Sequence, residues 1–232
     1  MINVDDLQVV VINNISKVWD DPDIRQIYGD ILSLKLRGYS KVYGENVISS
    51  DKADMFGTHI CVARKGLRLK PILSYKSVTS SACTKYMFDL PCLELIKKDA
   101  SRECYHQLEC LLDEISSSGR EVSFDYSWAQ DSSLIFTKDV GFKKSLQELT
   151  IALGVLHHQT YDIDDMIACG VLKVKTDKFF ELMGLRELTQ NSTFQQKNIN
   201  FAEAKIFHCN KFSPHALECA NRFSKLWDER IF

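Results

Sequence analysis

The chain has 232 residues, of which 45% are hydrophobic and 26% are charged, and its formal net charge is −2. This composition is typical of a globular protein, and the small net charge provides no overall attraction to nucleic acid or to an acidic membrane surface. No apolar run approaches the ~20 residues that span a bilayer, and the opening residues MINVDD do not resemble a signal peptide. We therefore expect a cytoplasmic protein with no nucleic-acid or membrane partner.

The first half of the chain alternates strand and helix patterns. Residues 7–12 predict a strand, and Asp21-Pro22 predicts a helix start, since Asp caps helices and Pro suits their first position. Gly38 is the expected end of this helix. Two strands are then expected over residues 57–64 and 71–80, and a helix over residues 93–117.

The second half continues the alternation to the last residues. The predicted elements are a strand at 121–128, an amphipathic helix whose apolar stripe ends at Leu156, a strand at 165–174, a short helix ending before Gly184, a strand at 200–209 and a last helix capped by Ser213. The order predicts a single α/β domain over residues 1–232, with a mixed sheet covered by helices on both faces.

The strand at 121–128 alternates strictly between polar and aromatic residues. Glu121, Ser123, Asp125 and Ser127 share one face, and Phe124, Tyr126 and Trp128 lie on the other. One interpretation places the polar face in a substrate cleft, where Glu121 or Asp125 accepts a proton from an attacking amine. The alternative is an antiparallel strand with one solvated face, which needs no function.

The next loop, KDVGFK from Lys138 to Lys143, leads into a helix. A glycine-marked loop at a helix N-terminus can bind phosphate, because backbone N–H groups and the helix dipole attract anions. Lys143 and Lys144 oppose that dipole, a local conflict that a bound anion would resolve. The alternative is two solvated lysines.

A histidine pair and the cysteines are candidate metal ligands or reactive groups, but the sequence does not favour either role. His157 and His158 are adjacent on a helix and point about 100° apart, so the spacing favours a helix-end pair over a shared metal. The eight cysteines include no C-x-x-C pair, and we expect reduced packing residues, Cys169 among them. No metal is predicted.

The element order around KDVGFK, with the later FFELMGL, resembles the acyl-coenzyme-binding half of the GNAT acyltransferase superfamily. The N-terminal half is similar to the branch of acyl-homoserine-lactone synthases and N-acyl amino acid synthases. That resemblance rests on residues 37–39 and 42–43, Asp51, Asp54, Leu90-Pro91 and Glu121. It implies a GNAT-like fold with a helical insert between the third and fourth strands and an extra C-terminal helix.

The resemblance also implies an activity, the transfer of an acyl group from a thioester of coenzyme A or acyl-carrier protein to the primary amine of a small molecule. Glu121 is the implied base, with Asp125 beside it. Two positions depart from the family pattern: Phe124 replaces an Arg, and Phe180 replaces the Tyr that serves as acid. The alternatives are that Tyr161 or Tyr126 substitutes as the acid, or that the thiol takes its proton from water. A non-catalytic module that senses an acyl thioester or contacts a protein partner is the alternative. The donor is expected to contact Tyr126, Ser127, Trp128, Lys138, Val140, Gly141, Phe142, Lys143 and Phe180.

Overall fold

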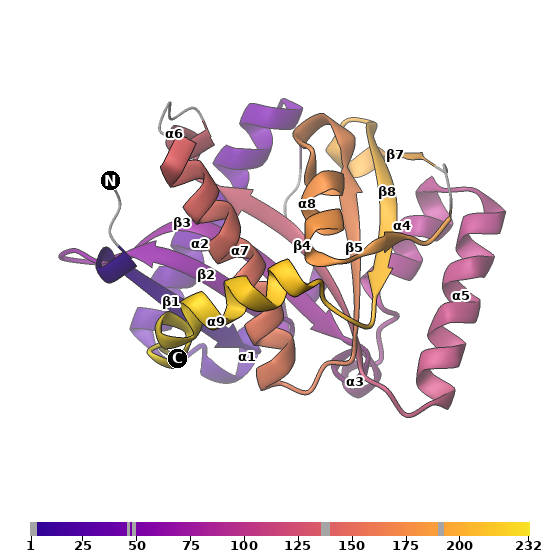
Figure 1. Ribbon diagram of the computed structural model, residues 1–232, viewed down its shortest axis with the longest axis horizontal. Helices are drawn as coiled ribbons and strands as arrows, with labels where there is room; N and C mark the ends of the chain where they lie inside the picture. The colour runs from indigo at the N-terminus through magenta and orange to yellow at the C-terminus, as the bar shows by residue number, and fades with distance from the viewer. Residues whose placement is uncertain (1–3, 46, 48–49, 136–139, 190–192) are drawn as a thin grey trace.

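The computed structural model in Figure 1 describes residues 4–45, 47, 50–135, 140–189 and 193–232. Its described strands form one mixed sheet of eight, in the order β1-β2-β3-β4-β5-β8-β6, with β7 also paired to β8. The strands are β1 Leu7–Asn13, β2 Thr58–Arg64, β3 Lys70–Thr79, β4 Val122–Gln130, β5 Asp165–Val171, β6 Arg186–Glu187, β7 Phe194–Gln196 and β8 Ala202–Cys209.

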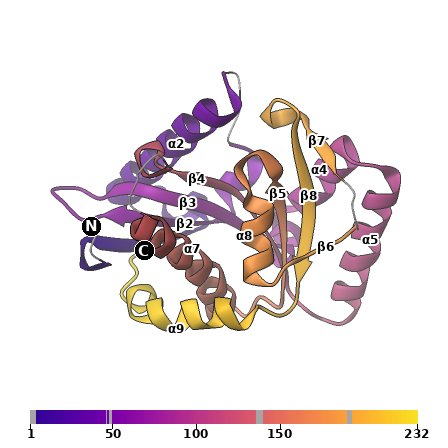
Figure 2. The same ribbon diagram turned by 45° about the horizontal axis from the view of Figure 1, so that its top comes forward.

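Helices cover both faces of the sheet, as Figures 1 and 2 show. The helices are α1 Ile15–Val18, α2 Pro22–Tyr43, α3 Ser80–Tyr86, α4 Pro91–Asp99, α5 Arg102–Ser117, α6 Ser132–Ile135, α7 Val140–Thr160, α8 Thr176–Met183 and α9 Pro214–Asp228. The apolar residues of α7, α8 and α9 pack on one face, whereas those of α1, α2, α3, α4 and α5 pack on the other. This arrangement follows from the alternation of side chains along each strand.

Two predicted helix boundaries were wrong. Asp21 caps α2 as expected, with Pro22 in its first turn, but the helix continues past Gly38 to Tyr43. Gly38 is a buried residue inside this helix, facing β4, and does not terminate it. The helix expected over residues 93–117 is two helices, because Ser101 interrupts it and caps α5.

Strand β4 has two irregularities that shape the molecule. Lys76 pairs with Tyr126 but Ser74 pairs with Ala129, so Ser127 and Trp128 together oppose one residue of β3. This is a β-bulge, and Ser127 has a φ of 62° there. On its other edge, β4 pairs in parallel with β5 only from Val122 to Asp125. Beyond Asp125 the two strands separate.

None of the helices that the structure describes is long and apolar enough to cross a bilayer. The eight cysteines are all free thiols, and Cys110 is the exposed one. This agrees with the expected role of the cysteines as packing residues.

Candidate functional site

A cavity of about 490 Å³ opens where β4 and β5 separate. Strand β4 contributes Tyr126, Ser127 and Trp128 to its wall, and β5 contributes Cys169 and Val171. The bulge lies directly at this wall. Because bulged residues fall outside the regular ladder, their backbone groups are the ones in β4 best placed to meet a ligand.

Helix α2 and the segment after it form the opposite wall. Tyr39 and Tyr43 reach the cavity from the last turns of α2, and Asp51 follows as the cap of a short 3-10 helix, Lys52–Met55. The hydroxyl of Tyr126 donates a hydrogen bond of 2.8 Å to Asp51 Oδ2. The acidic side chain is therefore fixed against the strand that carries the bulge.

Behind Asp51 lies a buried group of charges. Lys76 Nζ on β3 donates to Asp51 Oδ1 at 2.6 Å and to Asp54 Oδ1 at 2.9 Å. Lys35 Nζ on α2 lies 3.5 Å from Asp54 Oδ1, and both lysine side chains are fully buried. Burial raises the pKa of Asp54, but Lys35 and Lys76 outweigh this effect and hold the pKa below its ordinary value.

The same burial acts on the neighbouring bases. Desolvation lowers the pKa of Lys35 to about 8 even though Asp54 opposes the shift. It also lowers the pKa of His59 to about 3, with Lys35 adding to the effect. The neutral His59 ring shares a hydrogen bond of 2.8 Å with the backbone carbonyl of Asp54. These contacts make Asp51 the solvent-facing end of a rigid polar network.

Acidic side chains outnumber basic ones around the cavity. Of the charged residues in its wall, four are acidic and two basic: Asp51, Asp89, Glu94 and Asp99 against Lys52 and Lys98. A cleft with an excess of one charge concentrates ligands of the opposite charge. Two of the four carboxylates already have basic partners, since Asp51 Oδ1 lies 2.6 Å from Lys76 Nζ and Asp99 Oδ1 lies 3.3 Å from Lys197 Nζ. Asp89 and Glu94, which take part in none of the described ion pairs, are the acidic residues of the wall best suited to a cationic group.

The predicted site residues do not all lie together. Tyr126, Ser127 and Trp128 line the cavity. Glu121 lies at the other end of β4, where it accepts hydrogen bonds from Ser80 Oγ at 2.6 Å and from the backbone N–H of Ser81 at 2.9 Å. This carboxylate holds the start of α3. Its predicted role as a base has no support from this position.

Tyr161 and Phe180 also lie outside the cavity wall. The hydroxyl of Tyr161 accepts a hydrogen bond of 2.9 Å from the side-chain amide of Asn13, the last residue of β1. Phe180 is fully buried in the core, with its ring 6.0 Å from that of Trp128. Phe180 therefore lies behind Trp128 and outside the cavity wall, so the structure gives no support to its predicted contact with a donor.

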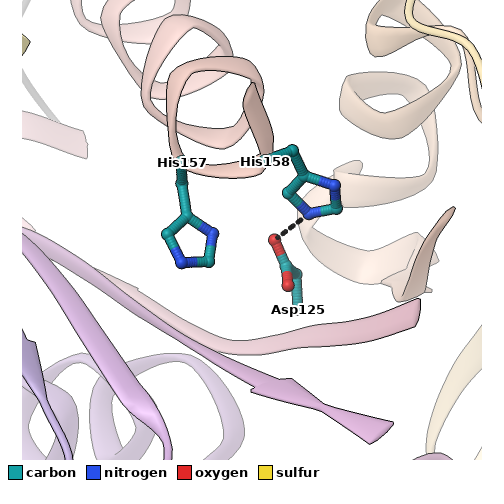
Figure 3. Close-up of side chains that lie close together, drawn as sticks. All are labelled: Asp125, His157 and His158. Atoms are coloured by element: carbon teal, nitrogen blue, oxygen red, sulfur yellow. Dashed lines mark hydrogen bonds and ion pairs between the residues drawn. The ribbon is translucent and has the colours of Figure 1, made fainter. Parts of the chain in front are cut away.

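The polar face of β4 was predicted to line a substrate cleft, and this prediction is wrong for Ser123 and Asp125. Ser123 and Asp125 are fully buried beneath α7, whereas Phe124 and Tyr126 face the cavity side. Figure 3 shows Asp125 beside His157 and His158 at the end of α7. Asp125 Oδ2 lies 3.3 Å from His158 Nε2, and Asp125 Oδ1 accepts from Ser77 and Ser123 at 2.6 and 2.8 Å. The carboxylate serves this internal network and not the cavity.

The residues predicted to hold phosphate lie at the start of α7. Val140, Gly141 and Lys143 are exposed there and Phe142 is half-buried, whereas Lys138 lies outside the described residues. Helix α7 follows β4 in the chain after α6, and none of these four described residues belongs to the cavity wall.

Sequence reasoning did not place Tyr39, Tyr43, Asp51 and Cys169 in one site. The first three entered only as markers of the resemblance in residues 37–54, and the strand pattern emphasised Glu121 instead. Tyr39 hydrogen-bonds with Ser127 of the bulge, and burial raises its pKa well above the ordinary value. Burial likewise raises the pKa of the Cys169 thiol, which accepts a hydrogen bond from Gln196.

No family model and no curated protein matches the sequence. Solved structures do match. FeeM, an N-acyl amino acid synthase from uncultured soil microbes, has a TM-score of 0.50 and 13% identity, over 88% of this chain and 91% of its own. The AHL synthase LasI has a TM-score of 0.52 and 15% identity, over 91% of this chain and 93% of its own.

A polyamine N-acetyltransferase of Drosophila melanogaster, which catalyses formation of N-acetylagmatine, has a TM-score of 0.51 and 10% identity, over 89% of this chain and 100% of its own. The chain has the GNAT fold. The GNAT fold was expected from the sequence and is confirmed, including the helical insert of α4 and α5 between β3 and β4 and the C-terminal helix α9.

Proposed function

We propose that the protein is an N-acyltransferase, which moves an acyl group from a thioester of coenzyme A or acyl-carrier protein to the primary amine of a small molecule. The observation that carries the proposal is the cavity between the separated ends of β4 and β5, with the bulge in its wall. Proteins of the same fold include an N-acyl amino acid synthase, an AHL synthase and a polyamine N-acetyltransferase.

The donor would enter along the end of β4. Its pantetheine arm would contact Tyr126, Ser127 and Trp128, which line the cavity. Its phosphate groups would meet the first turn of α7 from Val140 to Lys143, where the helix dipole favours an anion. The exposed ammonium of Lys143 would add a second attraction.

The acceptor amine would bind at the acidic wall. Its nitrogen attacks the thioester carbonyl, so that a C–N bond forms and the C–S bond breaks, and the amine loses a proton. Asp51 is the best placed proton acceptor, because it lines the cavity and is fixed by Tyr126 and Lys76. Glu121 is the alternative that the sequence suggested, and the same assay tests both.

The leaving thiolate must gain a proton. Phe180 has no proton to donate, but Tyr39 lies in the cavity wall with its side chain hydrogen-bonded to Ser127. We therefore propose Tyr39 as the acid, in preference to Tyr161, which lies elsewhere, and to Tyr126, whose hydroxyl already donates to Asp51.

The test is amide formation, measured by liquid chromatography and mass spectrometry. Acetyl-CoA, a long-chain acyl-CoA and an acyl-carrier-protein thioester serve as donors, and agmatine, putrescine and amino acids as acceptors. We expect Asp51→Asn and Tyr39→Phe to lower turnover by about 10²–10⁴-fold. Glu121→Gln, Tyr161→Phe and the exposed Asp113→Asn are matched controls and should retain activity. Loss of activity in Glu121→Gln with full activity in Asp51→Asn would reverse the assignment.

A second candidate function rests on the missing hydroxyl at Phe180. A non-catalytic module would bind the donor in the same cavity without turning it over. Native mass spectrometry of the purified protein would then show a bound coenzyme, while no acceptor amine gives an amide. Failure to bind any of the three donors would contradict both candidates.

A further inference from the structure

Behind the cavity, on the opposite face of β4, two histidines and an aspartate meet in the protein interior. Asp125 comes from β4, and His157 and His158 come from the last turn of α7. All three are buried, with exposures of 0%, 1% and 2%. One ligand atom from each lies within 4.8 Å of the other two. In Figure 3 the rings of both histidines turn toward the strand that carries Asp125.

Adjacent helical residues point about 100° apart, and on that ground the sequence predicted no shared ligand for the two histidines. In the folded protein both rings are nevertheless directed into the interior, because other elements pack around the end of α7. The His157 ring packs beside Trp227 of α9, and the His158 ring packs beside Phe212. Both rings are thus kept inside the protein, where Asp125 supplies the third group.

The polar atoms of this group are incompletely satisfied. His158 Nε2 lies 3.3 Å from Asp125 Oδ2 and 3.0 Å from Ser123 Oγ. His157 Nδ1, in contrast, is buried and has no hydrogen-bond partner among the residues that the structure describes. A buried polar atom without a partner is costly, and an unpaired imidazole nitrogen beside a carboxylate and a second imidazole points to an additional ligand.

We propose that Asp125, His157 and His158 bind one divalent transition-metal ion of the zinc class. Two imidazole nitrogens and one carboxylate oxygen form a donor set that suits Zn²⁺, Co²⁺, Ni²⁺ or Fe²⁺ better than Mg²⁺ or Ca²⁺.

The surroundings of Asp125 also suit a metal ligand. Its second oxygen, Oδ1, accepts hydrogen bonds from Ser77 and Ser123, which fixes the carboxylate as neighbouring groups do in metal sites. Among the described residues, His158 is the sole ion-pair partner of Asp125. A divalent ion would therefore balance a buried charge that no lysine or arginine of the described segments pairs with. Ser77 or Ser123 could complete the coordination.

The ion would join two elements that build the proposed active site. Asp125 precedes Tyr126 of the cavity wall, and its carbonyl oxygen accepts a hydrogen bond of 3.3 Å from the indole of Trp128. Fixing Asp125 to the end of α7 would stabilise β4 at its bulge. Because the three ligands are buried and outside the cavity wall, the ion would act on stability and not on the reacting atoms.

The test begins with the whole protein. It is purified without a metal-affinity tag, treated with chelator and titrated with Co²⁺, whose visible absorption reports nitrogen and oxygen ligands. We expect one ion per chain, displaced by Zn²⁺, and a higher melting temperature with Zn²⁺ than with chelator. The substitutions His157→Gln and Asp125→Asn should each weaken Co²⁺ binding at least tenfold and abolish the rise in melting temperature.

Matched controls separate this site from surface binding. Exposed His106 and Cys110 lie four residues apart, 3.8 Å at the closest, and could bind metal weakly. His106→Gln and the exposed His215→Gln should leave the stoichiometric Co²⁺ spectrum unchanged. If wild-type protein binds neither Co²⁺ nor Zn²⁺ in a 1:1 ratio, or if His106→Gln removes the signal, the proposal is wrong. The wild-type titration decides this even if a variant fails to fold.

Discussion

Among individual residues, Asp54 has the most demanding position. Its carboxylate lies between two fully buried lysines, Lys76 at 2.9 Å and Lys35 at 3.5 Å. Breaking a buried ion pair from one side leaves uncompensated charge, which costs far more than the loss of a surface pair. Asp54 therefore holds together α2, β3 and the segment that presents Asp51 to the cavity.

We expect Asp54→Asn to lower the free energy of unfolding by about 3–5 kcal/mol, measured by urea denaturation at neutral pH. The amide has nearly the size of the carboxylate, so the loss reports charge rather than packing. Asp113→Asn, on the exposed side of α5, is the control and should change stability by less than about 0.5 kcal/mol. Equal stability of the two variants would mean that the lysines find other partners.

The burial of His59 should make the stability of the folded protein depend on pH. Burial lowers its pKa to about 3 in the folded protein, from an ordinary value of 6.5. The unfolded chain therefore binds a proton first as the pH falls, so stability is complete above pH 6.5 and is lost toward pH 3. At pH 5 the loss from this residue is about 2 kcal/mol.

The comparison is the change in unfolding free energy from pH 7 to pH 5 in wild type and in His59→Gln, which does not titrate. The variant should lose less stability than wild type over this interval. Parallel pH curves for the two proteins would show that His59 already takes up its proton in the folded state.

At the scale of elements, helix α7 links the two proposed sites. Its first turn carries Lys143, whose positive charge opposes the helix dipole, while its last turn carries His157 and His158. Lys144 is less suitable for a mutational test, because its Nζ lies 3.9 Å from Glu148 Oε1 and a substitution would also remove this ion pair. Lys143 is thus the position where binding and stability should respond with opposite signs.

Lys143→Gln should raise the free energy of unfolding by about 0.3–1 kcal/mol in the absence of ligand, and should weaken coenzyme A binding measured by calorimetry. Lys225→Gln is the matched control, because Lys225 lies in the last turn of α9, where a positive charge suits the dipole. That variant should lose a little stability and bind coenzyme A normally. Unchanged coenzyme affinity in Lys143→Gln would remove Lys143 from the phosphate site.

On the scale of the whole molecule, much of the fold could be predicted from the sequence. Strong alternation and the caps at Asp21 and Ser213 placed the long strands and helices, and the resemblance supplied their arrangement. The missed elements are the shorter ones, α1, α3, α6, β6 and β7. Such segments depend on contacts with distant parts of the chain, which local patterns do not contain.

The candidate site was harder to predict, for physical reasons. Alternation along β4 separates its two faces but does not say which one faces a cavity, and Asp125 is buried because His158 and Ser77 satisfy it from distant segments. The bulge at Ser127 then moves Trp128 to the opposite face, where it stacks on Tyr75 at 4.0 Å. Neither a partner distant in sequence nor an extra residue in a ladder is visible in a single strand pattern.

The edge strand β1 yields a prediction about the entire sheet. Its free edge is covered by Ile231, whose N–H donates to Val9 at 3.1 Å and whose carbonyl accepts from Val11 at 3.1 Å. Ile231→Pro should remove the first bond, lower the melting temperature and raise light scattering on heating, because uncovered edges pair between molecules. Ile231→Val should behave as wild type. Equal scattering by all three proteins would mean that the edge needs no cover.

The stacking of Trp128 on Tyr75 has a spectroscopic consequence. The chain has three tryptophans. Trp19 is 46% exposed and Trp227 is buried beside His157, so neither lies in the wall of the cavity, whereas Trp128 does. A thioester that enters between β4 and β5 would displace water from one indole out of three. The intrinsic fluorescence of the unlabelled protein can therefore follow donor binding in real time, with Trp128→Phe as its dark reference.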